Sequence, residues 1–586
     1  MGSSPSKHKA IVRTKSEPQL RVPVNRHVPV RRAISALSAQ GTALPTDSFK
    51  FSLKNSEDPH FEIPEEEYKD GQLGISNPRH IQKKLRRLGN YELFCDQAFP
   101  ADHNALFYSD RPETQGILWK RPKDLVEEWQ KPYLVLDGVT RDDIKQGTLG
   151  DCWFLSACAA VSQRENYMKK IVPGDQPLFG EGYQGIVHFQ FWRFGQYVDV
   201  YVDDRLPTVD GKLIYARCTD PTEFWVALIE KAYAKLHGSY EAIEGGQAMN
   251  ALVDLTGGLA ERHEVINKDP ILYRLVDRAI LSEAFVACSR KGDWRLSTIA
   301  DPNGLVSGHA YTITDIRKIK HERGEEKLVR IRNPWADNNE WKGSWSDNDV
   351  NWHWVDDATK KEIGLQLKDD GEFWMSYRDF CKHFQEVTIC LTGPDFDGDG
   401  TADKCHVEML KGEWILGKTA GGSRNDLAMF SMNPQYVLTL SEPDDFDEKK
   451  DDPEREGLCT IVISLMQEHR RSKRNVKVKS LQIGFFIYKT QDPTVKLNIQ
   501  HFRYNRDCGK SGVYINYREV SQRFELEPGH YVIIPSTFIV SESCFMLRVF
   551  GEKKFSLAGP KEDVPVQMNG HTTSVKGRSG PFDGPF

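Results

Sequence analysis

The chain has 586 residues and a formal net charge of −6 at pH 7, which argues against a general nucleic-acid-binding protein. Its hydrophobic fraction of 39% and charged fraction of 28% are those of a globular protein, and its length predicts about three or four domains. Eleven cysteines without a Cys-x-x-Cys pair indicate reduced thiols rather than a disulfide framework or a zinc site. We expect neither a signal peptide nor a membrane span, because no apolar run is suited to either.

The N-terminal stretch up to about residue 75 is rich in Ser, Pro, Arg and Lys and lacks apolar periodicity, so it is expected to be mostly disordered. Met1, Gly2 and Ser6 match the N-myristoylation pattern. A basic cluster nearby would supply the second signal that stable membrane attachment requires. The alternative is an ordinary Met-Gly start and a solvated basic tail. We therefore expect a cytoplasmic protein, peripheral at membranes if Gly2 is acylated.

A short motif, Gln-Gly-Thr-Leu-Gly-Asp-Cys-Trp-Phe-Leu, occupies residues 146–155. Its glycines and Asp151 predict a tight turn, and the apolar run from Trp153 to Val161 predicts a helix. Cys152 would then lie at the positive end of the helix dipole, which lowers a thiol pKa and favours the reactive thiolate. The alternative is a small, inert buried cysteine, which is common at such a position.

Two downstream segments, 304–314 and 328–335, alternate apolar and polar residues and predict strands. Pairing them antiparallel about a turn near residues 321–322 places His309 opposite Asn333. A cysteine nucleophile needs a His base and a group that orients the imidazole, and Asn333 is suited to that task.

Gln146 lies six residues before Cys152, where its amide can assist the Cys152 N–H in binding an oxyanion. The predicted catalytic set is therefore Cys152, His309, Asn333 and Gln146. A structural His at the start of a strand is the alternative for His309 alone, but the whole set in this order favours catalysis.

The residues 146–153 resemble the nucleophile motif of the calpains, which are papain-like cysteine proteases. Residues 308–311 and 330–335 are similar to the calpain His and Asn motifs. The likeness extends from about Leu88 to Ser556 and includes the sequences at 371–375 and 432–436. It lacks the Cys-Gly-Ser-Cys context of the papain and cathepsin type. The chain is identified as a member of the calpain family, in an atypical form without a penta-EF-hand domain.

The resemblance implies an α+β protein with a two-lobed papain-like core, followed by an all-β C2-like sandwich and preceded by a disordered basic extension. Strands of the sandwich are expected at 460–466, 481–488, 495–500, 530–534 and 543–550. The expected divisions are an extension with a short helix near its end (1–88), a lobe carrying the nucleophile (89–245), a lobe carrying His and Asn (246–393), the sandwich (394–556) and a disordered tail (557–586).

By the same resemblance, two calcium sites are expected inside the protease lobes. The oxygen donors suit Ca²⁺, which takes six to eight oxygen ligands. The first set comprises Leu136 and Gly138 through their carbonyls, Asp143 and Glu223, and the second comprises Glu340, Asp347, Lys368 through its carbonyl, Asp370 and Glu372. The sequence alone gives only surface acids at these positions.

A separate segment, 395–400, begins like an EF-hand loop. His406 occupies the twelfth position, where that loop needs a bidentate Glu, so we expect no EF-hand there.

The resemblance implies a calcium-dependent intracellular cysteine endopeptidase that performs limited proteolysis of protein substrates. Expected partners are protein substrates and an acidic phospholipid surface, with no nucleic acid and no small regulatory subunit, so a monomer is favoured. One alternative is a catalytically silent scaffold that binds a membrane or a partner. Another is a transglutaminase-like acyl transferase, although such enzymes pair His with Asp rather than Asn.

Overall fold

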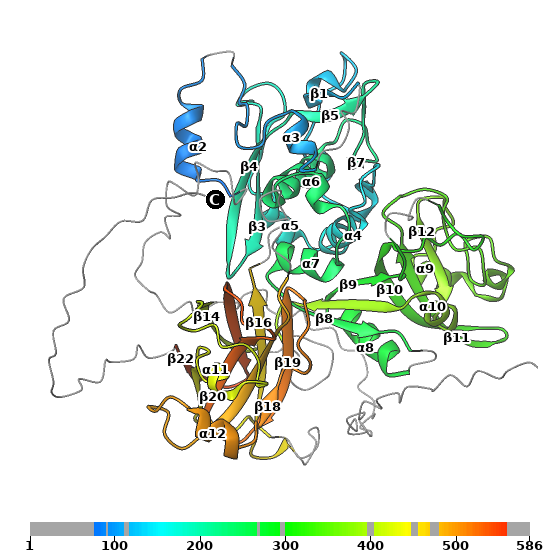
Figure 1. Cartoon of the computed structure of the whole chain (residues 1–586). Helices are drawn as coiled ribbons and strands as arrows, with labels where there is room; N and C mark the ends of the chain where they lie inside the picture. The colour runs from blue at the N-terminus through cyan, green and yellow to red at the C-terminus, as the bar shows by residue number, and fades with distance from the viewer. Residues whose placement is uncertain are drawn as a thin grey trace, which may run out of the picture.

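The structure is a computed structural model that describes residues 75–89, 92–109, 116–266, 270–293, 299–394, 404–446, 455–468 and 480–559. Gly2 and the EF-hand-like segment 395–400 lie outside the described residues, as do most of the predicted N-terminal extension and of the predicted tail. Two core regions and a β-sandwich are seen in Figure 1, with the sandwich below and the second core region to one side.

The first core region is built around three buried helices, α4 (Cys152–Val161), α6 (Trp225–His237) and α7 (Ala248–Thr256). Every residue of α4 is buried, so this helix is apolar all round rather than along one face. Around them lie α2 (Pro78–Leu85), α3 (His103–Leu106), α5 (Glu165–Ile171), β1 (Leu118–Lys120), β2 (Ile144–Lys145), β3 (Ile186–Arg193), β4 (Gln196–Asp203), β5 (Leu206–Val209), β6 (Lys212–Leu213) and β7 (Arg217–Cys218), with the 3-10 helices η1 (Pro122–Asp124), η2 (Arg141–Asp143) and η3 (Glu241–Ile243).

The second core region is a six-stranded antiparallel sheet in the order β12-β11-β10-β9-β13-β8. Its elements are β8 (Leu259–Glu264), α8 (Pro270–Leu281), β9 (Phe285–Ser289), β10 (Ala310–His321), β11 (Gly324–Arg332), η5 (Val350–Trp354), α9 (Asp357–Glu362), β12 (Glu372–Ser376), α10 (Tyr377–His383) and β13 (Glu386–Leu391). Helix α8 and the 3-10 turn η5 belong to the apolar cover of this sheet.

The β10–β11 hairpin confirms the predicted antiparallel pairing but differs in its details. The strands extend beyond the two predicted segments and pair continuously up to a tight turn at residues 322–323. A bulge between Ile313 and Asp315 shifts the register by one residue, because two residues of β10 there oppose one step of β11. The observed pairs next to the site, such as Thr312 with Arg332, have positions that sum to 644, within the predicted range of about 642–644.

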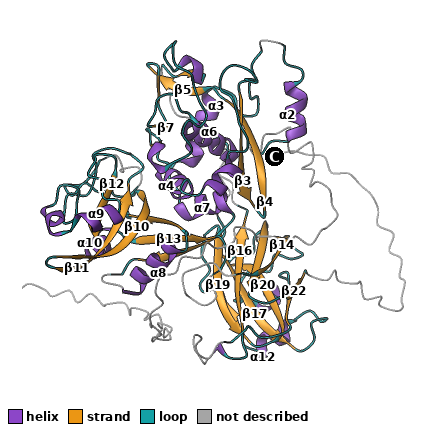
Figure 2. Cartoon of the chain, turned by 180° about the vertical axis from the view of Figure 1, so that it is seen from behind, coloured by secondary structure: helices purple, strands orange, loops and turns teal. Residues whose placement is uncertain are grey.

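The β-sandwich packs a four-stranded sheet, β14-β21-β16-β19, against a five-stranded sheet, β18-β17-β20-β15-β22, over one apolar core. Figure 2 shows these strands from behind. The elements are β14 (His406–Trp414), α11 (Leu427–Phe430), β15 (Tyr436–Leu440), β16 (Cys459–Gln467), β17 (Ile483–Thr490), α12 (Ile499–Tyr504), β18 (Gly509–Lys510), β19 (Glu519–Leu526), β20 (Gly529–Thr537), β21 (Ser543–Gly551) and β22 (Phe555–Ala558).

The prediction of a strand at 495–500 in the sandwich is wrong. Val495 is exposed, and the chain turns into α12 at Asn498, whose side chain accepts the N–H groups of Gln500 and His501. This N-cap offers the backbone a helical start that the apolar alternation of the sequence did not reveal.

Buried ions join the sandwich to the first core region. Asp254, on α7, accepts a hydrogen bond from Arg518 of the sandwich at 2.8 Å and one from Tyr233 at 2.8 Å. Arg548 of β21 donates to the carbonyl of Gly257 at 3.1 Å and pairs with Glu519. The sandwich therefore contacts the end of α7, where the chain passes into β8 and the second sheet.

Glycine also allows close packing just before the start of α7. A Cβ on Gly246 would lie 2.3 Å from Cε2 of Trp153, so α4 and the segment before α7 approach too closely for any side chain there. Helix α7 belongs to the apolar core of the first region, and the second sheet begins at Leu259.

Among the described residues, no helix combines the length and apolar character needed to cross a bilayer.

The buried ion pair at Asp254 leads to a stability prediction. Arg518→Met removes one of two cations from the carboxylate of Asp254, which is 1% exposed and still pairs with Arg193 at 3.3 Å, so the loss is expected to cost about 1.5–3 kcal/mol. As a matched control, Lys489→Met breaks the solvent-exposed pair with Glu527 and is expected to change stability little, because water screens that pair. Urea denaturation of the full chain measures both variants. Equal losses in the two variants would contradict the assignment.

Candidate active site

Cys152 is the first residue of α4 and is buried. The backbone of Ala310, in β10, hydrogen-bonds to its thiol. Burial raises the pKa of the thiol to about 12, and the charge of Asp151 acts in the same direction, against smaller opposing effects from backbone groups. The predicted lowering of this pKa is wrong for the present arrangement, because removal from water outweighs the helix dipole.

His309 lies just before β10 and is 2% exposed. Its Nε2 is 2.8 Å from Oδ1 of Asn333, which is fully buried after β11. The indole of Trp335 stands 5.2 Å from the imidazole, centroid to centroid, and Tyr311 meets the ring edge-on at 4.8 Å. The structure thus brings the predicted base and its predicted orienting amide into direct contact inside an apolar surround.

The hydrogen bonds fix the tautomer of His309. Oδ1 of Asn333 also accepts a hydrogen bond from the backbone N–H of Trp335 at 3.1 Å, which identifies that atom as the amide oxygen. Nε2 of His309 therefore carries the hydrogen, and Nδ1 of the neutral ring holds the lone pair. Burial lowers the pKa of His309 to about 4, while the bond to Asn333 opposes this. The imidazole is a neutral base at pH 7, and no hydrogen bond joins these two described side chains, Cys152 and His309.

Gln146 is held within the turn that leads to Cys152. Its Nε2 donates to the carbonyl of Leu149 at 2.7 Å, and its backbone N–H donates to Pro334 at 2.9 Å. One amide hydrogen remains for a ligand, because the planar amide has two. The second of these bonds ties the nucleophile turn to the segment that follows Asn333.

Three further contacts join the two halves of the site. Thr312 Oγ1 donates to the Ser156 carbonyl at 2.8 Å and so fixes β10 against α4. Arg141 pairs with Glu372 at 3.2 Å, and Arg332 pairs with Asp142 at 3.1 Å. The sequence analysis did not predict these three contacts, because no pattern in the sequence pairs these side chains across the two core regions.

The first predicted calcium set lies near η2 and the start of α6. Oε1 of Glu223 accepts the Leu136 N–H at 2.9 Å, and Oδ2 of Asp143 receives the indole N–H of Trp225 at 3.3 Å. Burial, then the charge of Asp143, raises the pKa of Glu223 to about 7. Gly138 has a φ of +96°, which glycine adopts without strain in this turn. Donor N–H groups thus already engage both carboxylates.

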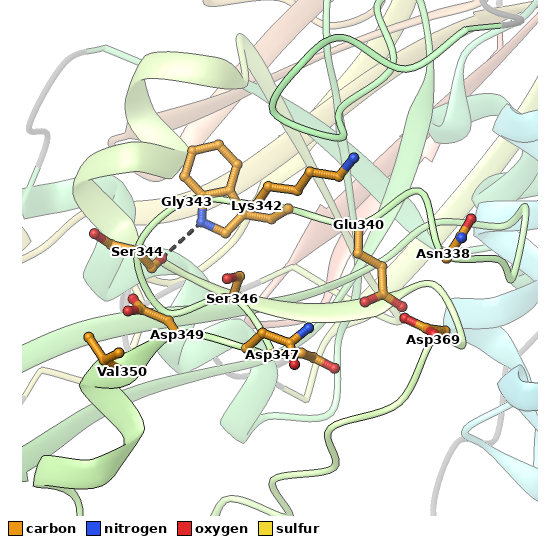
Figure 3. Close-up of a pocket in the computed structure, with 12 residues that line it drawn as sticks. Asn338, Glu340, Lys342, Gly343, Ser344, Ser346, Asp347, Asp349, Val350 and Asp369 are labelled. Carbon is orange, nitrogen blue, oxygen red and sulfur yellow. Dashed lines mark hydrogen bonds between the residues drawn. The ribbon is translucent and has the colours of Figure 1, made fainter.

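The second predicted calcium set borders a cavity of about 540 Å³. Figure 3 shows the carboxyl groups of Glu340, Asp347 and Asp369 gathered on one side of it. Burial raises the pKa of Glu340 to about 7 and that of Asp347 to about 6, and Asp370 adds to both shifts. Oδ1 of Asp347 is buried and has no hydrogen-bond partner, while Oδ2 accepts the Lys368 N–H at 3.0 Å.

The remaining members of the second set are partly engaged elsewhere. Glu372 binds Arg141 and accepts Thr314 Oγ1 at 2.7 Å, while Asp370 accepts the Glu372 N–H at 2.9 Å. Within the described ranges, no group of three or more His, Cys, Asp or Glu side chains is arranged to hold a metal ion. The acids of this set are therefore neighbours without being a formed coordination shell.

A chain of hydrogen bonds connects this acidic set to the base. Oε1 of Glu340 accepts the Gly371 N–H at 2.7 Å, and the Gly371 carbonyl accepts the Asn333 N–H at 2.8 Å. Gly371 has a φ of +84°, and a Cβ there would lie 2.9 Å from the Asn333 carbonyl oxygen. Only glycine fits this link, which passes directly from Glu340 to the residue that orients His309.

A buried thiol at a helix start, facing a sheet that carries a His–Asn pair, is the arrangement of a cysteine hydrolase. Comparison with protein families matches residues 94–391 to "Calpain family cysteine protease" and residues 410–550 to "Calpain large subunit, domain III". The chain belongs to the calpain family, with a protease core followed by a β-rich domain III.

Relatives support the same conclusion. Calpain-A and Calpain-B of Drosophila melanogaster are 43% and 42% identical to 82% and 81% of this chain. Calpain-9 of Rattus norvegicus is 42% identical over 84% of it. The chain spans 60%, 52% and 70% of the lengths of these three proteins, respectively.

The raised thiol pKa predicts slow alkylation. Without calcium, at about pH 7.5, Cys152 is expected to react with iodoacetamide more than about tenfold more slowly than exposed Cys95, because little thiolate forms. Its rate should still rise above about pH 9, since the pKa of the buried thiol lies near 12. Mass spectrometry of the labelled peptides follows both residues in one sample. A fast Cys152 reaction with a plateau near neutral pH would contradict the neutral thiol.

Proposed function

We propose that the protein is a calcium-dependent intracellular cysteine endopeptidase that performs limited proteolysis through Cys152, His309 and Asn333. The observation that carries the proposal is the 2.8 Å bond between His309 and Asn333, which leaves Nδ1 as the free base. Family membership supports the reaction class, and packing of α4 against β10 supports cooperation between the two core regions.

The reaction begins when Nδ1 of His309 takes the proton of the Cys152 thiol and the sulfur attacks the scissile carbonyl carbon. The N–H of Cys152 and the remaining amide hydrogen of Gln146 bind the resulting oxyanion. His309 then gives its proton to the leaving amine, and a thioester remains on Cys152. Water, deprotonated by His309, hydrolyses the thioester and restores the thiol.

Asn333 keeps the imidazole in the productive tautomer and orientation throughout this cycle. Its oxygen accepts Nε2–H, so the proton arriving at Nδ1 creates an imidazolium that retains this bond. Trp335, packed beside the ring, keeps water from competing for the bond.

Calcium fits the donor chemistry of the second acidic set. Oδ1 of Asp347 is buried without a hydrogen-bond partner, and after burial the nearby carboxylates raise the pKa of Asp347, a repulsion that a bound cation would offset. The residues proposed to hold calcium are Glu340, Asp347, Lys368, Asp370 and Glu372 in the second set, and Leu136, Gly138, Asp143 and Glu223 in the first. When bound, calcium supplies a fixed positive charge that stabilises these carboxylates in their ionised form.

Protein substrates enter as extended segments, because the site accepts a polypeptide between two core regions. We further propose a cytoplasmic monomer without a small regulatory subunit, which contacts acidic phospholipid through its N-terminal basic cluster and an acyl group on Gly2. Only the sequence pattern supports these partners. That pattern does not predict binding to nucleic acid.

The alternative function is a catalytically silent scaffold. It is favoured by the neutral state of Cys152 and His309 and by the absence of a hydrogen bond between these two described side chains. The two functions differ in whether any calcium concentration produces peptide-bond cleavage.

Casein cleavage separates the two functions. The wild type is expected to cleave casein only with calcium, Cys152→Ser to be inactive, and Asn333→Ala to lose about 10²-fold in kcat because the imidazole loses its orienting partner. Cys158→Ser, a buried thiol on the same helix, serves as the control that retains cleavage. Activity in Cys152→Ser, or none in the wild type at any calcium concentration, would overturn the proposal.

The calcium proposal is tested at Asp347. Asp347→Asn removes the charge of the unpartnered carboxylate and is expected to raise the calcium concentration for half-maximal cleavage by about tenfold, with maximal kcat retained. Asp143→Asn tests the first set in the same way. Asp357→Asn, at an exposed position on α9, is the charge-matched control. Calcium titrations that coincide for all four proteins would contradict calcium binding at both sets.

A further inference from the structure

Two acidic side chains, Asp151 and Glu230, are buried together next to the nucleophile. Asp151 directly precedes Cys152 and is 0% exposed, and Glu230 lies on α6 and is 1% exposed. Neither takes part in the reaction described above. An acid without water must be neutralised or bonded, so the partners of this pair determine its state.

The partners of the two carboxyls are unequal. Both oxygens of Glu230 accept the Ala216 N–H at 3.1 Å. Asp151 stands at the N-cap position of α4, yet its side chain caps no N–H group of the helix, and its carboxyl meets no N–H or O–H donor of another residue, only its own backbone N–H. Its hydrogen-bonding neighbour is the carboxyl of Glu230. Two ionised carboxylates are both acceptors only, so a bond between them requires a proton on one.

No cation provides an alternative to that proton. In the part of the chain that the structure describes, the ion pairs include neither Asp151 nor Glu230, and the titratable groups that interact with them are all acids: Cys152 and Cys158 on α4, and Tyr240 and Glu244 on either side of η3. Burial raises the pKa of both carboxyls, to about 7 for Asp151 and well above the usual range for Glu230.

A nearby carboxylate shows the contrast. Glu241, in η3, accepts the N–H groups of Tyr108 and Ser109 at 2.8 and 2.9 Å and the Ser109 hydroxyl at 2.5 Å. Donors of this kind stabilise an ionised carboxylate. Asp151 has no such donor, so burial alone does not explain its environment.

We propose that Asp151 and Glu230 share one proton and that this acid–carboxylate pair is a positioning element for the nucleophile. The pair ties the residue before Cys152 to α6 and so fixes the peptide whose N–H belongs to Cys152. That N–H is one of the two oxyanion donors in the proposed function, on which this inference rests. The main-chain carbonyl of Asp151 meanwhile accepts the N–H groups of Phe154 and Leu155 at 2.8 and 3.1 Å, so the same residue starts the helix.

The shared proton also limits the charge beside the thiol to one. Loss of the proton would place a second negative charge next to Cys152 and raise the pKa of its thiol further, against thiolate formation. Glutamine at position 230 preserves the contact without a proton, because its amide donates to Asp151 while its oxygen accepts the Ala216 N–H. Alanine at position 230 leaves Asp151 unbonded. The two substitutions therefore separate the hydrogen bond from the proton.

Infrared spectroscopy of the full chain without calcium detects the proton directly. At about pH 8.5 exposed carboxyls are ionised, and the wild type is expected to retain a protonated-carboxyl band that both Glu230→Gln and Asp151→Asn lose. Glu241→Gln, at a buried carboxylate with its own donors, is the matched control and should leave that band unchanged. A band that persists in both Glu230→Gln and Asp151→Asn, or is missing from the wild type, would overturn the shared proton.

Steady-state kinetics on a peptide substrate tests the positioning role. Glu230→Ala is expected to lower kcat by about 10²-fold with KM little changed, because an oxyanion donor acts in the transition state. Glu230→Gln should restore kcat to within about threefold of the wild type, and exposed Glu165→Gln controls for net charge. A Glu230→Gln enzyme as slow as a folded Glu230→Ala enzyme would overturn the role of the bond.

The two experiments distinguish a failure of this inference from a failure of the proposed function. If the wild type hydrolyses no polypeptide, the endopeptidase proposal fails, and the infrared comparison still decides whether the carboxyls share a proton. If Glu230→Ala does not fold, the comparison of Glu230→Gln with the wild type still decides, because a kcat more than about tenfold below the wild type would contradict the tolerated amide.

Discussion

The exclusion of water between α4 and β10 is the constraint on which the site depends. Thr312 of β10 bonds to the Ser156 carbonyl of α4, and the contact buries the thiol of Cys152 and the imidazole of His309 together. The same desolvation raises the pKa of the acid and lowers that of the base, so both groups are neutral. In such surroundings a lone thiolate or imidazolium is costly, and the two charges are stabilised only as an adjacent pair.

The base is also the end of a rigid hydrogen-bonded path. Glu340 holds the Gly371 N–H, the Gly371 carbonyl holds the Asn333 N–H, and Asn333 holds His309. A displacement of the acidic segment around Glu340 must therefore move the orienting amide or break one of these bonds. This gives the acids at the cavity a direct mechanical connection to the imidazole, without any motion of the whole sheet.

Much of this site could be predicted from the sequence, because local patterns encode it: the turn before Cys152, the α4 helix and the two alternating segments that bring His309 to Asn333. The sign of the thiol pKa shift could not be predicted, since it depends on how β10 covers the helix start. The bulge after Ile313 and the cap at Asn498 each depend on single residues, which a pattern of apolar periodicity does not detect. Contacts such as Arg141 with Glu372 depend on the relative placement of the two core regions.

Besides buried acids such as Glu241, which N–H and O–H donors stabilise, two further groups of buried acids have different consequences. Asp203 and Asp254 have cations within 3 Å, and these ion pairs join separate elements of the fold. Within the described ranges, Glu223, Asp347, Asp151 and Glu230 form no ion pair, so a proton or a bound cation must take that place. Asp151 precedes the nucleophile and Asp347 borders the cavity, whereas Asp203 and Asp254 lie in the structural core and at the sandwich contact. Buried acids without a cation thus lie where gain or loss of a proton or a bound cation would change the site. Buried acids with a cation lie where they stabilise the fold.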